Sequence, residues 1–472
     1  MKTSRKHHRS IIFLFSMLFI TACKISKDIA VPDPELPVSY RDYSSRDSSI
    51  ADLPWQSFIV DNDLRLLITN ALVHNNDLQI AVKNIEAAGL AFNQTKLGNM
   101  PQIDLQTSAN SSRPSDNSLN GLSLNQYLHA KHVEDYTQAV SLSWEADIWG
   151  KIHSQKASAL AFYLQTAEAR KAVQTRVISD VAKGYYNLLM LDDQLSIAAR
   201  NVRLNDSTLT IINLQYQAGQ VTSLAIEQAS AQKLSAAGLV PHYEQQIAVQ
   251  ENALSILCGT LPSAIVRHQK LESVPFAEKP GAGIPSEILS HRPDVKSAEL
   301  AVTKANADVG YAKAYLYPSL SITAQGGLDA FKASNWFNIP ASLFGAVASG
   351  ITQPLFQQKK LRTQYLLAKV KRDQNVIDFR QSVLIAMEEV SDALVKLDKY
   401  KQQQSIAAER TTTLKKATGN AQLLFKNGLA NYLEVITAQG NVLQSELELA
   451  TIKKERLDAN IDLYRSVGGG TN

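Results

Sequence analysis

The stretch that decides the fold is Val181–Tyr216, VAKGYYNLLMLDDQLSIAARNVRLNDSTLTIINLQY, in which an apolar or aromatic side chain returns at every seventh residue. Such a repeat predicts a long amphipathic helix that packs against helical partners. Proline is absent from the whole of residues 151–217. We therefore expect one helix with a length of roughly 100 Å at 1.5 Å per residue.

The chain nearly repeats itself around this stretch. Residues 181–259 align without a gap on residues 390–468, and residues 77–105 align on residues 294–322. Two repeats of this length indicate a duplicated domain, because solenoid arrays use many shorter repeats. The spacing between the two aligned stretches is eight residues longer in the first half. We place these extra residues in a loop within Ser111–Asp135, which is rich in Ser, Asn and Gly and is predicted to be solvated.

The second long helix carries the same seven-residue spacing with polar members. Its positions equivalent to the first stripe are Val390, Leu397, Gln404, Thr411, Thr418 and Phe425. The three polar residues have two interpretations: a solvated helix face, or looser packing against partners near a moving tip.

Each half also contains two segments that alternate apolar and polar residues, which is typical of strands. Strands of about 9 to 11 residues are long enough to cross an outer membrane when tilted. Four strands cannot close a barrel, since the smallest single-chain barrels have about eight. The strands therefore form either a soluble sheet or a part of a barrel that several chains share. The predicted first repeat covers 55–270, with strands at 101–112 and 136–149 and a helical hairpin at 151–259; the second covers 271–472, with strands at 318–327 and 342–356 and a hairpin at 359–468.

The N-terminus predicts export from the cytoplasm. Residues 1–22 combine a basic start with a short apolar run, as in a signal peptide, and Ile20-Thr-Ala-Cys23 resembles a bacterial lipobox. Cleavage before Cys23 and acylation of its thiol would anchor the mature chain in a membrane. The alternative is an ordinary signal peptide that ends near a cysteine. Lys24 is not the Asp associated with inner-membrane retention, so we favour the outer membrane. Residues 23–54 are interpreted as an extended, lipid-anchored linker, with order beginning at Trp55.

Charge and motifs argue against nucleic-acid binding and catalysis. The formal charge of +4 belongs to the whole chain, and residues 1–22 hold four basic and no acidic residues, so the mature chain is formally neutral. The sequence contains no phosphate-binding glycine loop and no nucleophile motif. His129, His132, Glu134 and Asp135 lack a second set of metal ligands and are interpreted as solvated loop residues. We predict a protein that is not an enzyme and has no cofactor and no metal.

Several motifs, taken together in this order, resemble those of the outer membrane efflux proteins of the TolC-like channel-tunnel family, in its NodT-type lipoprotein branch. They are Asn76-Asp-Leu78, Leu142-Ser-Trp-Glu-Ala-Asp-Ile-Trp-Gly-Lys151, Ile284-Pro-Ser, Arg292-Pro-Asp294, Tyr317-Pro-Ser-Leu320, Gln353-Pro-Leu-Phe356, Glu388-Glu-Val390, Asn427-Gly-Leu-Ala-Asn-Tyr-Leu-Glu-Val435, Ala438-Gln439 and Gly468-Gly-Gly470. The resemblance covers nearly everything after Cys23.

The resemblance implies a mostly α-helical homotrimer with a membrane β-barrel part. Each protomer would give four strands to a twelve-stranded barrel, and the duplicated hairpins would form a tunnel through the periplasm. The implied function is the passive exit duct of a tripartite efflux system, with a periplasmic adaptor and an inner-membrane pump as partners. A protein-secretion duct of the same fold is a second hypothesis, and a lipid-anchored adaptor or structural coiled coil is a third. The sequence does not identify the exported compounds.

Three sets of residues are candidates for function. Trp144 and Trp149 are interpreted as a membrane girdle or, alternatively, as core residues where a strand passes into a helix. Glycine at the end of each long helix predicts a hairpin turn, which would serve either as an adaptor-docking tip or merely as a helix cap. The tip residues are Gly219, Gln220, Val221, Thr222, Ser223, Gly428, Leu429 and Ala430. The resemblance places a periplasmic gate at Glu434 and Thr437, beside Asn431 and Tyr432, although Thr437 departs from the Asp that many relatives have.

Overall fold

The computed structural model describes residues 28–31, 36–40, 49–275 and 281–471. The chain forms two compact units, and four helices contribute residues to both. The first unit comprises Met1–Pro32, Ala87–Tyr163 and Leu300–Val376, and the second comprises Asp33–Glu86, Leu164–Glu299 and Ile377–Asn472. Cys23 and the predicted signal peptide lie outside the described residues.

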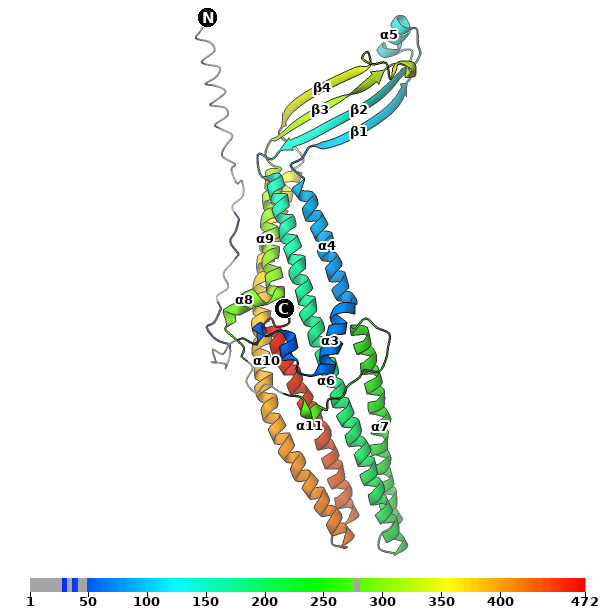
Figure 1. The fold of residues 1–472 in the computed structure, drawn as a ribbon, viewed down its shortest axis with the longest axis vertical. Helices are drawn as coiled ribbons and strands as arrows, with labels where there is room; N and C mark the ends of the chain where they lie inside the picture. The colour runs from blue at the N-terminus through cyan, green and yellow to red at the C-terminus, as the bar shows by residue number, and fades with distance from the viewer. Residues whose placement is uncertain (1–27, 32–35, 41–48, 276–280, 472) are drawn as a thin grey trace. The chain divides into compact units, whose positions relative to one another are not determined.

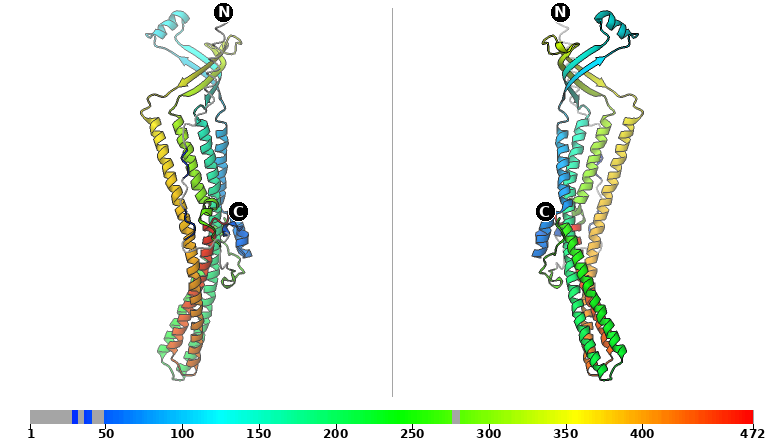
Figure 2. Two further views of the ribbon diagram at one scale, coloured as in Figure 1. Left: turned by 90° about the vertical axis from the view of Figure 1, so that its left-hand side faces the viewer. Right: turned by 90° about the vertical axis from the view of Figure 1, so that its right-hand side faces the viewer.

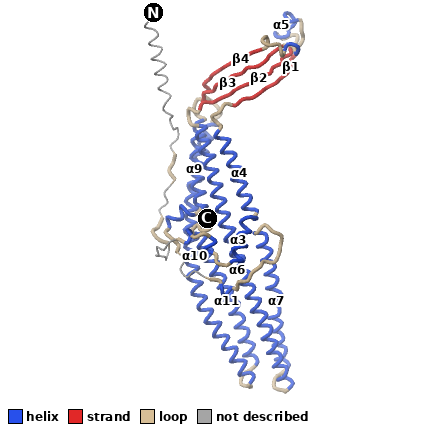
Figure 3. The backbone as a smooth tube through the Cα atoms, in the orientation of Figure 1, coloured by secondary structure: helices blue, strands red, loops and turns tan. Residues whose placement is uncertain are grey.

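The first unit contains a four-stranded antiparallel sheet in the order β1-β2-β3-β4 (Figure 3). The strands are β1 Gln102–Ser112, β2 Val133–Ala146, β3 Ser319–Ala330 and β4 Leu343–Thr352. Consecutive strands pair throughout, with Leu105 opposite Val140 and Leu142 opposite Ala324. The four predicted strands are therefore present, although β2 begins earlier and β4 ends earlier than the alternation predicted.

The loop between β1 and β2 is not the irregular segment that the sequence predicted. It contains α5, Leu119–Leu128, whose first turn is capped by the Ser118 hydroxyl accepting from the Gly121 N–H at 3.1 Å. The eight extra residues of the first half do lie in this loop, because 20 residues separate β1 from β2 and 12 separate β3 from β4. The position of the extra residues was predicted correctly, but the helix was not, because a short neutral helix lacks a sustained apolar period.

The helices repeat the plan of the first half in the second (Figure 1). Each long helix has the same length as its equivalent in the other half. The first pair, α6 Lys151–Gln217 and α10 Lys360–Lys426, has 67 residues each, and the second pair, α7 Ser223–Leu257 and α11 Tyr432–Ser466, has 35 each. The shorter elements are η1 Ile50–Asp52, α2 Trp55–Phe58, α3 Asn62–His74, α4 Asn76–Lys96, η2 Leu271–Ser273, η3 Pro285–Glu287, α8 Ile288–His291, α9 Pro293–Ala314 and η4 Ala333–Asn335. The predicted duplication is therefore confirmed.

The seven-residue stripe forms the interior of the second unit along its middle part. Val181 and Leu188 on α6 are fully buried, as is Val390 on α10. The stripe fails at its last position on α6, where Tyr216 is exposed, whereas Phe425 at the equivalent position of α10 is buried.

Order in the second unit begins before Trp55. Ile50 and Ala51 of η1 are buried, and the Ile50 N–H donates to the carbonyl of Gly281 at 2.9 Å. Tyr40 is also buried, and burial beside Glu287 raises the pKa of its phenol. Part of the predicted extended linker is thus packed against the body of this unit.

A duplicated junction joins each hairpin to a short helix. The Asn75 amide after α3 donates to the Leu257 carbonyl at 2.8 Å, and the Arg292 guanidinium after α8 donates to the Ser466 carbonyl at 3.1 Å. A glycine closes each junction in the left-handed region, Gly259 with φ of +65° and Gly468 with φ of +96°. These two residue pairs occupy equivalent positions of the two repeats.

We predict that Gly259→Ala lowers stability markedly. A Cβ there would lie 2.1 Å from the His74 carbonyl oxygen, and the backbone conformation itself would cost on the order of 1–3 kcal/mol for a residue other than glycine. Gly238→Ala in α7 is the matched control, since its Cβ would meet no atom within 4 Å, and it should stabilise by about 1 kcal/mol. Thermal unfolding followed by circular dichroism measures both. Equal midpoints for the two variants would contradict the close approach.

Candidate functional site

The sheet is apolar on one face along its whole width. The strand register places the Ile103–Leu142 pair, the Trp144–Ile322 pair and the Ala324–Val347 pair on the same side, because alternate residues of a strand share a face. The large apolar side chains on this face are Ile103, Leu105, Tyr136, Val140, Leu142, Trp144, Leu320, Ile322, Leu328, Leu343, Val347 and Ile351, with Glu134 and Gln138 among them near the loop end of β2. Many are exposed in the protomer, including Leu105 and Val347. Exposed apolar area on this scale needs a partner phase such as lipid.

The opposite face is polar over three strands. It carries Asp104, Gln106 and Ser108 on β1, with hydroxyl and amide residues of β2 and β3 in register beside them. β4 contributes mainly Ala, Gly and one Phe to this face. An apolar outer face and a polar inner face describe the wall of a water-filled membrane barrel.

Aromatic side chains lie at both ends of the sheet. At the helix end, the Trp144 indole N–H donates to the Asn99 carbonyl at 2.8 Å, and the Trp149 indole N–H donates to the Pro318 carbonyl at 2.6 Å. Both indoles are only half-buried, and the membrane girdle stays a prediction. At the loop end, Trp336 packs on Tyr136 with ring centroids 5.5 Å apart. Sequence patterns did not predict this second group because η4 and its flanks show no strand pattern.

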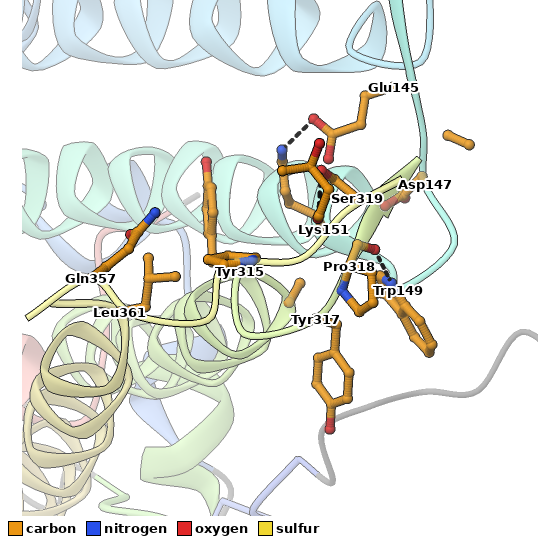
Figure 4. A pocket seen from close by; sticks show the side chains of 14 residues that line it. Glu145, Asp147, Trp149, Lys151, Tyr315, Tyr317, Pro318, Ser319, Gln357 and Leu361 are labelled. Carbon is orange, nitrogen blue, oxygen red and sulfur yellow. Dashed lines mark hydrogen bonds and ion pairs between the residues drawn. The ribbon is translucent and has the colours of Figure 1, made fainter. Parts of the chain in front are cut away.

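A pocket of about 380 Å³ lies where the sheet passes into the helices (Figure 4). Glu145 and Lys151 face one another across it, with carboxylate and ammonium 2.6 Å apart. The Lys151 ammonium also lies 4.8 Å from the centre of the Tyr315 ring. Asp147 accepts from the N–H groups of Ile152 and His153 and so caps α6. These contacts fix the start of the long helix relative to β2.

The turns of the two hairpins are built alike. Gly219 and Gly428 have φ of +74° and +70°, and the next N–H donates to the carbonyl five residues earlier, from Gln220 to Gln215 and from Leu429 to Leu424. The views in Figure 2 show the two tips side by side. They share an apolar cluster with buried members Ile212, Ala225, Ala229, Phe425 and Val435.

Most of the predicted tip residues are exposed. Gly219, Gln220, Thr222, Ser223, Gly428 and Leu429 face solvent, whereas Val221 and Ala430 pack against the shared cluster. A surface of exposed side chains on a fixed apolar base is suitable for docking another protein.

The four residues assigned to the gate separate into two groups. Asn431 caps α11 by accepting from the Leu433 N–H at 3.0 Å, and Tyr432 packs against the tip cluster. Glu434 and Thr437 are exposed on α11. Asn431 and Tyr432 thus hold the helix end, whereas the side chains of Glu434 and Thr437 are exposed.

Two of the three polar residues on the stripe of α10 are buried. The interpretation of these positions as a solvated helix face was therefore wrong for those two. Thr411 and Thr418 are buried, and the Thr411 hydroxyl lies 2.8 Å from the hydroxyl of Ser445. Gln439 is fully buried and donates to the hydroxyl of Thr208 on the other hairpin at 2.8 Å. The helices near the tips therefore pack through hydrogen bonds as well as apolar contacts.

Two ion pairs lie farther from the tips, a buried one within α11 and a half-buried one between α6 and α11. The Lys454 ammonium is 2.6 Å from the Asp458 carboxylate, and Lys183 pairs with Asp462. Burial raises the pKa of Asp458 to about 6 despite the neighbouring lysine. In the described part of the chain no group of three or more His, Cys, Asp or Glu residues could hold a metal. No helix among the described residues is long and apolar enough to cross a bilayer.

Comparison with known proteins decides the family. The profile of the outer membrane efflux proteins matches residues 67–260 and 284–469. The chain belongs to this family. It is 28% identical to the cation efflux system protein CusC of Escherichia coli K12, over 96% of this chain and 97% of CusC. It is 29% identical to the toluene efflux pump outer membrane protein TtgI of Pseudomonas putida, over 97% of each chain.

The fold agrees with this membership. A crystal structure of CusC matches with a TM-score of 0.82 and 26% identity, covering 95% of this chain and all of that one. The predicted fold class, outer-membrane location and efflux function are confirmed. The prediction that the chain is not an enzyme also holds, because the family consists of efflux channels. The adaptor or coiled-coil hypothesis is excluded for the same reason.

Proposed function

We propose that three copies of this chain close their sheets into one twelve-stranded barrel, which is the exit duct of a small-molecule efflux pump. The observation that carries the proposal is a four-stranded sheet with one apolar and one polar face and with β1 and β4 paired on one side only among the described residues. Backbone groups on an open edge have no partner in lipid, so a membrane sheet must close on itself. Pairing β1 of one copy with β4 of the next satisfies both edges.

Cys23 is proposed as the acylated first residue of the mature chain. Ile20-Thr-Ala-Cys23 supports it, and the site lies outside the described residues. Acyl chains and the barrel would then hold the protein in the outer membrane by two independent attachments.

Native mass spectrometry of the detergent-purified protein tests the trimer and the anchor together. We expect the mass of three chains that each begin at Cys23 and carry a diacylglyceryl group. Cys23→Ser should remove the lipid mass and keep the trimer, because the barrel alone can hold the protein in the membrane. A monomer would overturn the shared barrel, and an unmodified Cys23 would overturn the anchor.

Small molecules are the proposed cargo. CusC is named for cation efflux and TtgI for toluene efflux, and identities just below 30% to both do not decide between such compounds. Protein secretion through the same fold is the second candidate function, without a feature of this chain that favours it.

The hairpin tips are the proposed docking site for the periplasmic adaptor, since proteins of this family work with an adaptor and an inner-membrane pump. Exposed residues at both Gly turns, held by one apolar cluster, support this assignment. The two turns offer different chemistry, with polar Gln220 at the first and apolar Leu429 at the second.

A photo-crosslinking residue at Gln220 or at Leu429 should capture the adaptor in living cells, as identified by mass spectrometry. The matched control is Leu261, which is exposed in the loop after α7 and should capture none. Capture from the β1–β2 loop but not from the tips would refute the assignment.

Glu434 is proposed as the acidic residue of the periplasmic entrance, with Thr437 beside it. Its exposure and its place in the first turn of α11 support this role. Three carboxylates around a trimer axis would favour cations at the constriction.

Single-channel recording of the purified trimer tests the entrance. Glu434→Gln should reduce the preference for cations, because it removes one negative charge per protomer at the narrowest point. Glu227→Gln is the control, since Glu227 is an exposed carboxylate at the other tip. An unchanged reversal potential for Glu434→Gln, or an equal change for both variants, would exclude Glu434 from the constriction.

A further inference from the structure

The helix α5 in the β1–β2 loop carries large apolar side chains on two opposite sides. One side faces its own loop, where Leu124 and Gly121 are buried and a Cβ on Gly121 would lie 2.1 Å from the Ser115 carbonyl oxygen. The other side carries Leu119, Leu122 and Tyr127, which are 81%, 57% and 77% exposed. At 100° per residue these three side chains lie within an arc of about 140° opposite the buried side, which they share with Ser123 and Gln126.

The exposed apolar residues of α5 require a contact that removes them from water. The ten residues of α5 include no charged side chain. A surface helix normally turns its large apolar side chains toward the core, whereas α5 exposes three of them among uncharged polar residues. The described residues of the protomer leave the outer side of α5 open, so its partner lies outside the protomer.

A second apolar surface lies in the β3–β4 loop, at the same end of the sheet (Figure 1). Phe331, Phe337 and Ile339 are 73%, 66% and 64% exposed. Trp336 packs between Phe337 and Tyr136, with centroids 5.2 Å and 5.5 Å away. Its indole N–H is buried without a hydrogen-bond acceptor among the described residues. This loop is therefore incomplete in its polar contacts as well as in its apolar ones.

The strand order brings the two surfaces together only between copies. β1 and β4 are the opposite edges of the sheet. In the barrel proposed above, β1 of one copy pairs with β4 of the next, so the β1–β2 loop of the first copy adjoins the β3–β4 loop of the second. Each of the three seams would then place one open side of α5 beside one cluster of exposed Phe and Ile.

We propose that α5 is an intersubunit latch, in which Leu119, Leu122 and Tyr127 pack on Phe331, Phe337 and Ile339 of the neighbouring copy. The inference rests on the proposed trimer and adds a contact outside the strands. The latch holds the seam beyond the membrane, where water competes with the strand hydrogen bonds and the lipid no longer enforces pairing.

Disulfide trapping in outer-membrane vesicles tests the latch. Two differently tagged chains are co-expressed, one with Leu119→Cys and the other with Phe337→Cys. Oxidation should give a disulfide-linked dimer that carries both tags, and neither variant alone should give one. Pairing on separate chains excludes a bond within one protomer. The matched control replaces Phe337→Cys with Leu261→Cys, a more exposed position far along the chain, and should give no dimer.

A stability measurement distinguishes a stabilising contact from disulfides that form when two cysteines collide transiently. Leu119→Ser with Leu122→Ser should lower by several degrees the temperature at which the trimer dissociates in detergent, while Leu261→Ser leaves it unchanged. Both leucines are exposed in the protomer, so their loss spares its core.

The outcomes are distinct for the latch and for the trimer. A trimer by mass without mixed disulfides, or with an unchanged dissociation temperature, overturns the latch and keeps the barrel. Quenching of a fluorophore at Leu119→Cys by a lipid-soluble quencher would assign α5 to the membrane surface, which also overturns the latch. A monomeric protein would overturn the barrel itself.

Discussion

The structure depends on the hydrogen-bonding groups at the two edges of a four-stranded sheet. β1 and β4 each pair on one side within the protomer, and their other sides present N–H and C=O groups to the surroundings. Water can satisfy these groups but lipid cannot, and the apolar face from Ile103 to Ile351 indicates lipid. The sheet is therefore stable in a membrane only when its edges meet other edges. In the proposed trimer that requirement would make the oligomer part of the fold.

The duplication supplies the rest of the architecture but is broken at the tips. Equivalent positions of the two repeats have the same conformation at the junctions, where Gly259 and Gly468 both have a positive φ. They differ on the returning helices, because Ala225 is buried and its equivalent Glu434 is exposed. One hairpin thus turns an apolar residue inward where the other turns a carboxylate outward. The duplication therefore leaves a carboxylate on one of the two tips only at this position.

Sequence patterns predicted what periodicity controls. The stripe through Val181 and Leu188 indicated the long helices, and strand alternation indicated the two faces of the sheet. The burial of Thr411 and Thr418 escaped prediction because each hydroxyl bonds to the carbonyl four residues earlier, at 2.7 Å and 2.9 Å. A threonine that satisfies itself in this way can be buried at modest cost, and hydropathy does not register it.

The helix α5 escaped prediction for a different reason. Its polar residues are Asn, Ser and Gln, which favour loops in isolation, and its apolar residues surround the helix instead of forming one stripe. Such a pattern does not predict a helix from the protomer's own packing, because the second set of apolar residues makes no contact within the protomer.

Charged side chains are unevenly distributed along the proposed duct. The polar face of the sheet consists mainly of hydroxyl and amide groups, with the carboxylates Asp104 and Glu145 near its helix end and Asp135 and Asp329 near its loop end. Glu145 is neutralised by Lys151, and Asp147 by two backbone N–H groups at the start of α6. Neutral polar walls keep a wide lumen filled with water without binding what passes. An unpaired carboxylate is therefore most effective where the passage narrows, because electrostatic influence in water falls off within a Debye length of about 8 Å. In the proposed duct the carboxylate of Glu434 would therefore act on ions at the entrance.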